Sequence, residues 1–363
     1  KLDPEAAWWK KRQVARVSNA IVRKQLKEKL ESSGVEYARK IGVIQNSLYG
    51  VDIQPEAAEI SKLRCFLSLV VDENIDESKP NRGIEPLPNL EFKFVTADTL
   101  IKLPEENGQR GLFDNWEEMQ ELEELRNDYI QSYGKQKQRI KEQFLKVQQK
   151  MFKDQLSLFS DKASRAYQLS TWNPFGHEKS NWFDPKWMFG VEQFDVVIGN
   201  PPYVEHKKLK HIASKLKPHY EVYTGSSDLS VYFFEAAFNV LKENGTLCYI
   251  STNKFFNTGY GRALRSYLTQ RNINQIINFE QVEVFKGVLV SSVVYLSENS
   301  STLKENSFTY YEFHNEPNWK TAFKEKLRER ERIYNQSTLS DGEWVFLKGN
   351  EASIKNKIEK AGV

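Results

Sequence analysis

Short apolar runs alternate with longer stretches of helical periodicity along much of the 363-residue chain. The apolar runs predict strands at residues 47–53, 92–98, 194–200, 246–251 and 273–279. The periodic stretches predict helices at residues 56–71, 229–244 and 261–271, and a hairpin-like end is expected at 284–296. Because strands that alternate with helices usually form a mostly parallel sheet, the pattern predicts an α/β fold.

Local signals add detail to several of these elements. Pro55 suits the first turn of the helix that it opens. Asp228 is predicted to cap the helix at 229–244, and Gly245 to end it. The run from Asp195 to Ile198 is expected to be a buried strand, as is usual in parallel sheets.

Residues 105–170 interrupt the alternation with a segment rich in Glu, Lys and Gln. Its apolar residues recur at helical spacing: Trp116, Met119, Leu122, Leu125, Tyr129, Tyr133, Ile140, Phe144, Val147 and Met151. The spacing predicts one long helix or a helical pair broken near Gly134. We expect an amphipathic insertion packed on its host, rather than a separate binding arm. It should project from the sheet, because its polar face is too charged to bury.

Both ends of the chain are more polar than its middle. Residues 1–45 predict a charged helix. After residue 300, charged helical segments are predicted at 323–336 and at the C-terminal end.

Composition excludes several classes of protein. A hydrophobic content of 39% can supply one large core or two smaller ones, and the net charge of +3 is compatible with nucleic acid without requiring it. Cys65 and Cys248 lie in apolar surroundings and predict free buried thiols, which suits a reducing cytoplasm. No apolar run reaches transmembrane length, and the first residues do not resemble a signal peptide. The five histidines and two cysteines lack the spacing of a zinc site.

Three predicted strands end in a polar side chain: Asp52, Asp98 and Asn200. Ligands of open α/β sheets bind beyond the carboxyl ends of the strands. An acidic residue there can accept hydrogen bonds from both hydroxyls of a ribose. An Asp in this position is more often a simple helix cap or turn former, so the two aspartates alone indicate little.

The tetrapeptide Asn200-Pro201-Pro202-Tyr203 carries more information. Two consecutive prolines cannot donate hydrogen bonds to a sheet, so the strand must stop at Asn200. They also stiffen the turn, which holds the Asn200 side chain and the Tyr203 ring in fixed directions. A proline-rich turn that merely closes a strand is the alternative interpretation.

The chemistry of this turn suits methylation of a base amino group. Such an amino group is a poor nucleophile, because its lone pair is delocalised into the ring. Acceptors at the Asn200 side chain and the Pro201 carbonyl would draw the nitrogen towards tetrahedral geometry. Its lone pair could then attack a methylsulfonium carbon, and both acceptors favour the charge that develops. Tyr203 offers an aromatic face to a base flipped out of a duplex.

The sequence GNPPY after an apolar strand resembles the catalytic motif of amino-methyltransferases that use S-adenosyl-L-methionine. Four blocks, beginning LYGVDIQPEAAEISK, NRGIEPLPNLEF, WFDPKWMFGVEQ and GSSDLSVYFFEA, resemble successive blocks of type IIG (type IIS) restriction-modification enzymes. Related phage-exclusion methyltransferases share them. The resemblance covers residues 45–300 and implies a Rossmann-like class I fold and N6 methylation of adenine in DNA. It also implies the gamma arrangement, in which a target-recognition domain follows the catalytic domain.

The resemblance implies a role for each motif residue. Asp52 would bind the cofactor ribose, Ile53 would pack on its adenine, and Asp98 would accept from its amino group. Asn200, Pro201, Pro202 and Tyr203 would handle the target base, with Asn200 also facing the cofactor. Phe285, in EVFKGVLVSSVVYL, would cover the other face of the flipped adenine. The implied partners are double-stranded DNA with a flipped adenine and other regions of the parent polypeptide, with no membrane and no metal.

The chain also departs from the family pattern. The Gly-rich block expected before the strand at 47–53 is absent from the sequence. We therefore expect a fragment: a partial methyltransferase domain at 1–300 with a helical insertion near 105–170, and a helical linker at 301–363. A first strand, the Gly-rich loop, the recognition domain and any nuclease would lie elsewhere. The isolated chain is expected to bind cofactor weakly and to be inactive alone.

Five lysines follow the motif: Lys207, Lys208, Lys210, Lys215 and Lys217. They could neutralise DNA phosphates or form a solvated helix face. Two further functional interpretations stay open, a DNA-binding or assembly module whose pocket no longer turns over and a protein-glutamine methyltransferase with a similar motif. The long insertion and the matched blocks argue against the latter.

Overall fold

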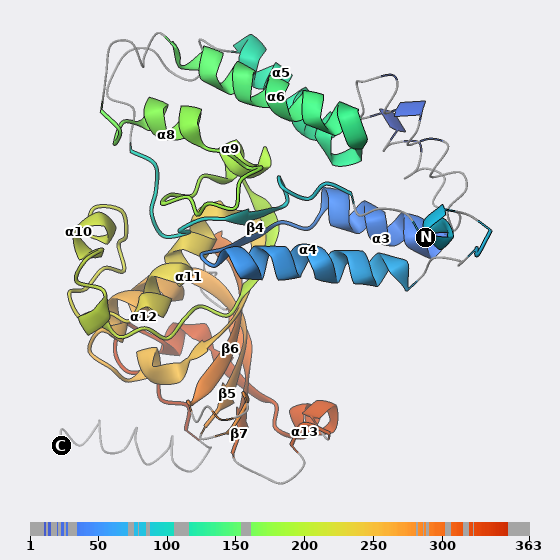
Figure 1. Ribbon diagram of the computed structural model, residues 1–363. Coiled ribbons are helices and arrows are strands. Elements are labelled where there is room, and N and C mark those ends of the chain that lie inside the picture. The colour runs from blue at the N-terminus through green and yellow to red at the C-terminus, as the bar shows by residue number, and fades with distance from the viewer. Residues whose placement is uncertain are drawn as a thin grey trace, which may run out of the picture. The chain divides into compact units, whose positions relative to one another are not determined.

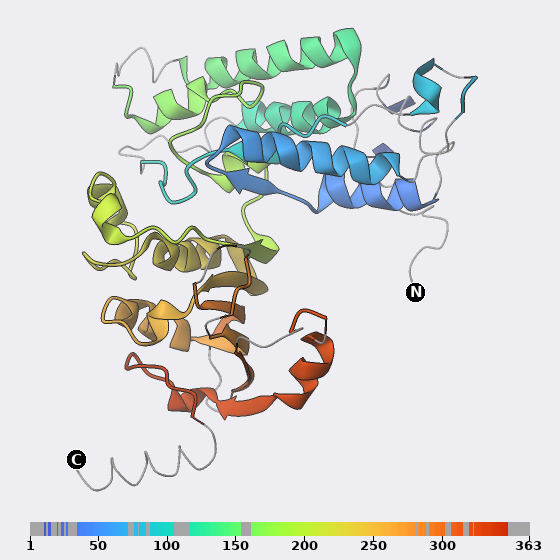
Figure 2. The ribbon, with the colours of Figure 1, turned by 60° about the horizontal axis from the view of Figure 1, so that its bottom comes forward.

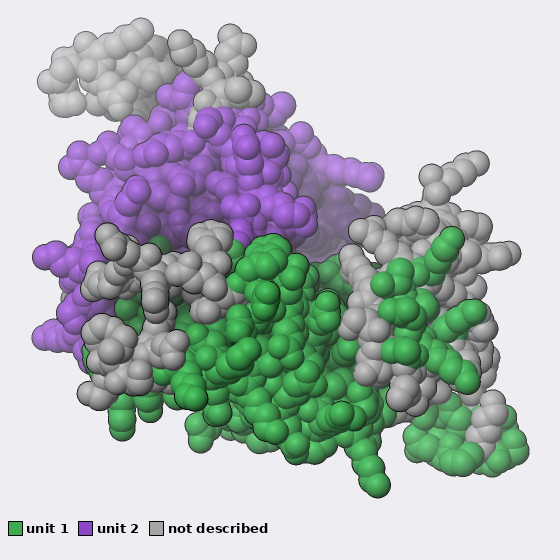
Figure 3. Space-filling view, turned by 90° about the horizontal axis from the view of Figure 1, so that it is seen from above, with its two compact units in different colours: residues 1–191 green, residues 192–363 purple. Residues whose placement is uncertain are grey.

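The computed structural model describes residues 35–347 and seven isolated positions between 11 and 27, with gaps at 72–75, 79, 85–87, 105–115, 154–160, 281, 286, 288–289, 302–305, 315–318 and 322. Most of the helix predicted for residues 1–45, and the helix predicted at the C-terminal end, therefore lie outside the described residues. The chain divides into two compact units, residues 1–191 and 192–363 (Figure 3). Among the described helices, none is both long and apolar enough to cross a membrane.

The first unit combines helices with a two-stranded parallel sheet (Figure 1). Its elements are α3 (Val35–Asn46), β1 (Gly50–Asp52), α4 (Pro55–Val70), η1 (Pro80–Gly83), β2 (Phe94–Thr96), α5 (Trp116–Gln131), α6 (Gly134–Met151), α8 (Arg165–Thr171) and α9 (Pro185–Phe189). β1 pairs with β2, with Val51 opposite Val95, which confirms the strands predicted at 47–53 and 92–98. An apolar cluster joins α3 to α4 and the chain before β2: Tyr37, Ile41, Ile44, Leu69 and Leu90.

Helix α4 begins at Pro55, as predicted, and has two apolar sides. One side packs on α3 through Leu69. The other is a stripe of exposed side chains at spacings of three and four residues: Ile60, Leu63, Leu67 and Val71. Exposed apolar stripes of this kind are uncommon on the surface of a self-contained domain.

The insertion forms the helical pair α5 and α6, and Gly134 starts the second helix with a φ of +55°. Its helical character is therefore confirmed over the described residues. Its buried side contacts Phe92 and Phe175 through the aromatic rings of Tyr129 and Phe144, and Phe92 in turn contacts the Trp172 ring. The insertion is thus packed on its host, as expected.

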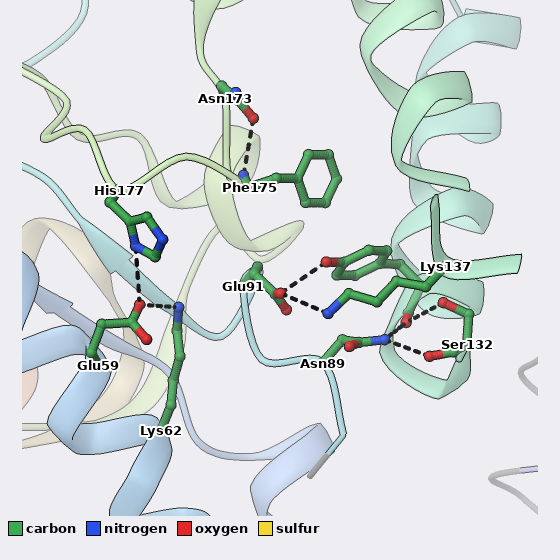
Figure 4. A network of polar contacts seen from close by, with 10 residues as sticks. Glu59, Lys62, Asn89, Glu91, Ser132, Lys137, Asn173, Phe175 and His177 are labelled. Atoms are coloured by element: carbon green, nitrogen blue, oxygen red, sulfur yellow. Dashed lines mark hydrogen bonds and ion pairs between the residues drawn. The ribbon is translucent and has the colours of Figure 1, made fainter. Parts of the chain in front are cut away.

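Polar contacts hold the same hairpin in place (Figure 4). The Glu91 carboxylate accepts from the Tyr129 hydroxyl at 2.8 Å and from Lys137 Nζ at 3.2 Å. The Asn89 side-chain amide donates to the carbonyl oxygens of Tyr129 and Ser132, at 2.6 and 2.7 Å. Asn89 and Glu91, which precede β2, thus provide hydrogen-bond partners for the turn between α5 and α6. These bonds hold the helical pair in place on its host.

The second unit is a six-stranded sheet with helices (Figures 1 and 2). Its elements are β3 (Phe194–Gly199), η3 (His206–Lys208), α10 (Ala213–Leu216), α11 (Leu229–Val240), β4 (Leu241–Thr252), η4 (Asn253–Phe256), α12 (Gly261–Thr269), β5 (Arg271–Phe279), β6 (Ser292–Ser301), β7 (Ser307–Phe313), α13 (Phe323–Glu329), β8 (Arg332–Asn335) and η5 (Gln336–Thr338). Helices α11 and α12 pack against the sheet.

Cys65 and Cys248 are free but only half-buried, and burial raises the pKa of both thiols.

The sheet order is β3-β4-β6-β5-β7-β8. β3 runs parallel to β4 and β5 parallel to β7, whereas β6 is antiparallel to both β4 and β5 and β8 is antiparallel to β7. The predicted mostly parallel sheet is therefore wrong in detail, because β6 turns back after β5 and inserts between β5 and β4. Within 301–363, predicted as a helical linker, the described residues form α13 but also β7 and β8. β7 joins the sheet because its alternate residues Phe308 and Tyr310 are buried.

Gly245 does not end α11, which stops at Val240. Gly245 instead lies within β4, where a β-carbon would come 2.9 Å from the Lys242 carbonyl oxygen and 3.2 Å from that of Asp195. Only glycine allows this close approach of backbone segments.

β3 is present where it was predicted, but it is not buried. It hydrogen-bonds to β4 on one side and is the terminal strand of the sheet. The side chains of Val196 and Ile198 are 58% and 75% exposed. The burial expected of a parallel strand fails here because β3 is the terminal strand of the six-stranded sheet and pairs with a neighbour on one side only.

Two substitutions test the exposed strand. Ile198→Thr should change the free energy of unfolding by less than about 0.5 kcal/mol, because this side chain has little contact to lose. Ile276→Ala, at a fully buried position of β5, should cost about 2–5 kcal/mol. Urea unfolding of the 363-residue chain measures both. A loss above about 1 kcal/mol for Ile198→Thr would mean that this face is covered in solution.

Candidate functional site

The turn after β3 is fixed at both ends. Gly199 pairs in register with Tyr249 of β4, and a β-carbon at Gly199 would lie 2.9 Å from the Tyr249 ring. Beyond the prolines, the Val204 N–H donates to the Pro202 carbonyl at 3.2 Å, and the Val204 carbonyl accepts from the Leu229 N–H at 2.9 Å. Residues 200–203 are therefore clamped between the end of β3 and the start of α11.

Within this turn, Asn200 is exposed and Tyr203 is half-buried. The Tyr203 hydroxyl lies 3.5 Å from Asn200 Oδ1, at the outer limit of a hydrogen bond. Partial burial raises the pKa of Tyr203, and the Ser292 hydroxyl beside it acts in the opposite direction. Ser292 opens β6 opposite Thr252, the last residue of β4. Tyr203 thus lies over the sheet edge at which β3 and β4 end.

The loop that carries Phe285 leaves from the same edge of the sheet. It connects Phe279, at the end of β5, with Ser292, and these two residues face each other in register. The Phe285 side chain is 38% exposed. Within the loop, the Gly287 N–H donates to the Glu283 carboxylate, and Gly287 has a φ of +77°. Whether Phe285 faces Tyr203 across one cleft stays a prediction.

A short chain of polar side chains, which no sequence motif predicts, also lies at this edge. The Asn253 side-chain amide, just after β4, donates to Asn278 Oδ1 and to Glu280 Oε2, both at 2.9 Å. The Asn278 amide in turn donates to the Tyr310 hydroxyl at 3.2 Å. These bonds tie the ends of β4 and β5 to Tyr310 in the middle of β7.

Asp228 does not cap α11 with its side chain, so that prediction is wrong. Its carboxylate instead accepts a hydrogen bond from the Tyr260 hydroxyl at 2.7 Å, and Asp228 is only 8% exposed. Burial together with this bond raises the pKa of Tyr260. Because Leu229, the next residue, holds Val204, the Asp228–Tyr260 bond supports the clamp on the turn.

Asp52 and Asp98 lie in the first unit, at the carboxyl ends of the neighbouring strands β1 and β2. The Ala97 N–H donates to the Asp52 carbonyl at 2.9 Å, which places the two ends side by side. Asp52 Oδ1 accepts from the Gln54 N–H at 2.8 Å, and Asp98 Oδ1 accepts from the Leu100 N–H at 3.3 Å. Both aspartates are therefore turn formers, and the second oxygen of each carboxylate has no hydrogen bond among the described contacts.

The candidate residues therefore fall into two sets. Asp52, Ile53 and Asp98 gather in the first unit, where the Ile53 side chain is 45% exposed. The second unit holds residues 200–203, Phe285 and the lysines after the motif, with Lys207, Lys208 and Lys210 all exposed. Each set has the composition of a binding surface: acceptors beside an apolar side chain in the first, an amide beside an aromatic ring in the second.

Comparison with protein families matches residues 46–285 to the family described as Eco57I restriction-modification methylase. RM.MjaORFECS2P of Methanocaldococcus jannaschii is 24% identical over 338 residues, which cover 76% of this chain and 28% of that protein. The type II restriction enzyme and methyltransferase RM.Eco57I of Escherichia coli is 28% identical over 175 residues, or 47% of this chain and 17% of that protein. The type II methyltransferase M.HincII of Haemophilus influenzae is 35% identical over 108 residues, which cover 28% of this chain and 22% of that protein. The chain thus spans less than a third of each of these relatives.

A double-mutant cycle tests the support of the turn by Tyr260. Tyr260→Phe should lower the free energy of unfolding by roughly 1–3 kcal/mol, because a buried carboxylate loses its donor. Asp228→Ala should cost a similar amount, and the double variant should show a coupling of about 0.5–3 kcal/mol. Strictly additive losses in urea unfolding would show that the two side chains do not interact.

Proposed function

Since the chain belongs to the Eco57I restriction-modification methylase family, we propose that it carries the site for methyl transfer from S-adenosyl-L-methionine to the N6 atom of adenine in DNA. The observation that carries the proposal is the clamped turn, in which Asn200 Oδ1 lies exposed beside the Tyr203 hydroxyl. The parent polypeptide would act in a restriction-modification or phage-exclusion system in the cytoplasm.

The turn would act on the target base by binding its amino group. Asn200 Oδ1 and the Pro201 carbonyl would accept one amino hydrogen each, which draws the nitrogen towards tetrahedral geometry and withdraws its lone pair from conjugation with the ring. As the new N–C bond forms, positive charge grows on the nitrogen and both oxygens stabilise it. The nitrogen would then release one proton to solvent water, which reaches the exposed Asn200. Because the turn is held by Gly199, Val204 and Leu229, these acceptors need little reorganisation during the reaction.

Tyr203 would stack on one face of the flipped base, with Phe285 as the wall on the other face. Stacking on aromatic side chains contributes about 1–3 kcal/mol per base and offsets part of the cost of unpairing. Before the base enters, the Tyr203 hydroxyl keeps Asn200 Oδ1 engaged at 3.5 Å, and the longer-than-usual contact is readily exchanged for a better donor.

The first unit contains groups that fit the adenosine half of the cofactor. The second oxygen of the Asp52 carboxylate suits the ribose hydroxyls, and the exposed Ile53 suits the flat adenine ring. Asp98 would accept from the adenine amino group. The bound cofactor supplies an activated methyl group on a sulfonium sulfur, which keeps the electron pair of the broken C–S bond.

The amide of Asn200 is the first target for mutagenesis, in the longest parent polypeptide that contains this chain. Asn200→Ala should raise the barrier by about 2.7–4 kcal/mol, a loss of about 10²–10³ in kcat, with DNA binding nearly unchanged. Transfer of a tritiated methyl group to duplex DNA measures the rate, and base analysis identifies the product. Asn257→Ala, at an exposed asparagine of the same unit, is the control and should keep the rate.

Three results would contradict the proposal. Near-normal transfer by Asn200→Ala would remove the amide from the chemistry. N4-methylcytosine in place of N6-methyladenine would remove the adenine assignment. A radioactive glutamine in a protein substrate, with unlabelled DNA, would favour the glutamine methyltransferase.

Calorimetry on the 363-residue chain tests the cofactor residues separately. The chain contains no Gly-rich turn before β1 whose backbone N–H groups could hold the methionine half. Without three such hydrogen bonds, the free energy of binding is weaker by about 3–7 kcal/mol, a factor of roughly 10²–10⁵ in affinity. We expect the dissociation constant for S-adenosyl-L-methionine to be far above micromolar. A micromolar value that Asp52→Ala leaves unchanged would contradict both the weak binding and the role of Asp52.

A further inference from the structure

The segment from Val204 to His219, here called the lysine segment, has an unbalanced surface charge. Its five lysines are all exposed, and Glu205 is its one acidic residue. Among the described residues, no ion pair involves any of the five lysines. Two other exposed cations of the same unit do form ion pairs, Lys242 with Asp195 at 2.8 Å and Arg262 with Asp341 at 2.7 Å. The lysine segment therefore concentrates positive charge that the unit itself leaves uncompensated.

The segment is nevertheless well structured. Leu209 and Leu216 are buried, at 6% and 1% exposure, and fix its inner side. Consecutive backbone bonds close its turns: Ile212 N–H and Ala213 N–H both donate to the Leu209 carbonyl at 3.0 Å, and Lys217 N–H donates to the Ala213 carbonyl at 3.0 Å. α10 is the helical part of this segment (Figure 1). The lysines thus project from a shaped surface and need not be ordered from a random coil on binding.

The lysine segment is also continuous with the clamped turn. It begins at Val204, whose backbone bonds to Pro202 and Leu229 define the end of that turn. Lys207, Lys208 and Lys210 follow Asn200 by seven to ten residues along the chain. A polyanion bound to them would therefore lie near the turn. This proximity distinguishes the segment from a merely solvated helix face, which could occur anywhere on the surface.

We propose that the lysine segment binds the phosphate backbone of the DNA strand next to the target base. The inference rests on the proposed function, because it takes DNA as the substrate of the same turn. Duplex DNA presents one negative charge per about 1.7 Å of axis, so several closely spaced ammonium groups can each meet a phosphate. Such contacts fix the register of the duplex and carry no sequence information.

Salt dependence of DNA binding measures the number of phosphate contacts directly. The probe is a fluorescent duplex of arbitrary sequence, titrated with the 363-residue chain at increasing salt. Lys207→Gln/Lys208→Gln/Lys210→Gln should reduce the slope of log K against log salt by roughly 2.7, about 0.9 for each lost contact. Over a fourfold rise in salt, the unsubstituted chain should then lose about 40-fold more affinity than the variant. Lys215→Gln/Lys217→Gln should reduce the slope by roughly 1.8.

A matched control removes the same kind of charge elsewhere in the unit. Lys324→Gln/Arg328→Gln, at two exposed positions of α13, should leave the slope unchanged. Circular dichroism checks that all variants stay folded. An unchanged slope for the triple variant overturns the proposal, as does an equal change for the control. Loss of binding to anionic phospholipid vesicles, with unchanged binding to the duplex, would assign the segment to a membrane surface instead.

The outcome is separable from that of the methyl-transfer experiment. Asn200→Ala removes no charge, so it should keep the full salt slope whatever its effect on catalysis. If Asn200→Ala keeps normal methyl transfer while the lysine variants show a reduced salt slope, the proposed role of Asn200 is wrong and the phosphate-binding role of the lysine segment is supported. If methyl transfer depends on Asn200 but the salt slopes of the lysine variants do not change, only the phosphate-binding role of the lysine segment is wrong.

Discussion

The candidate site of the second unit depends on the point at which β3 stops. Pro201 and Pro202 have no N–H group, so the ladder between β3 and β4 cannot extend beyond Gly199. The chain must then leave the sheet at the edge where β4 ends and β6 begins. That constraint sets the exposed amide of Asn200 over the sheet edge and brings the Tyr203 hydroxyl to Ser292. The bonds at Val204, Leu229 and Asp228 stabilise an exit that the two prolines have already determined.

Local signals in the sequence were enough to predict most elements but not their partners. The apolar runs and Pro55 identified β1, β2, β3 and α4, because strand and helix periodicity are properties of neighbouring residues. The insertion of β6 between β5 and β4 could not be predicted, since strand order is decided by packing across the sheet. The same limit applies to Asp228: a cap is a local prediction, whereas its actual donor, Tyr260, lies 32 residues away.

The site residues show the same division between chemistry and placement. The identity of Asn200 and Tyr203, in a proline-stiffened turn, predicted an amide and a ring in fixed directions, and the structure brings the two within 3.5 Å. The aspartates Asp52 and Asp98 fit both interpretations, because one oxygen of each closes a turn and the other has no hydrogen bond among the described contacts; their role as ligands is a proposal. The roles of Glu283 and Asn253 cannot be predicted from the sequence, since a single Glu or Asn in a loop has no distinctive pattern.

The exposed face of β3 has a practical consequence for the handling of this chain. A terminal strand with an unpaired backbone edge, bearing Val196 and Ile198, can pair with the same strand of another molecule. β3 carries one charged residue, Asp195, but neither a lysine nor a proline, and its residues from Val196 to Gly199 are all uncharged. The terminal strand at the opposite margin, β8, is only four residues long and starts with Arg332. Pairing of β3 between molecules would therefore be one route to aggregation at high concentration, and it would involve the residues directly before Asn200.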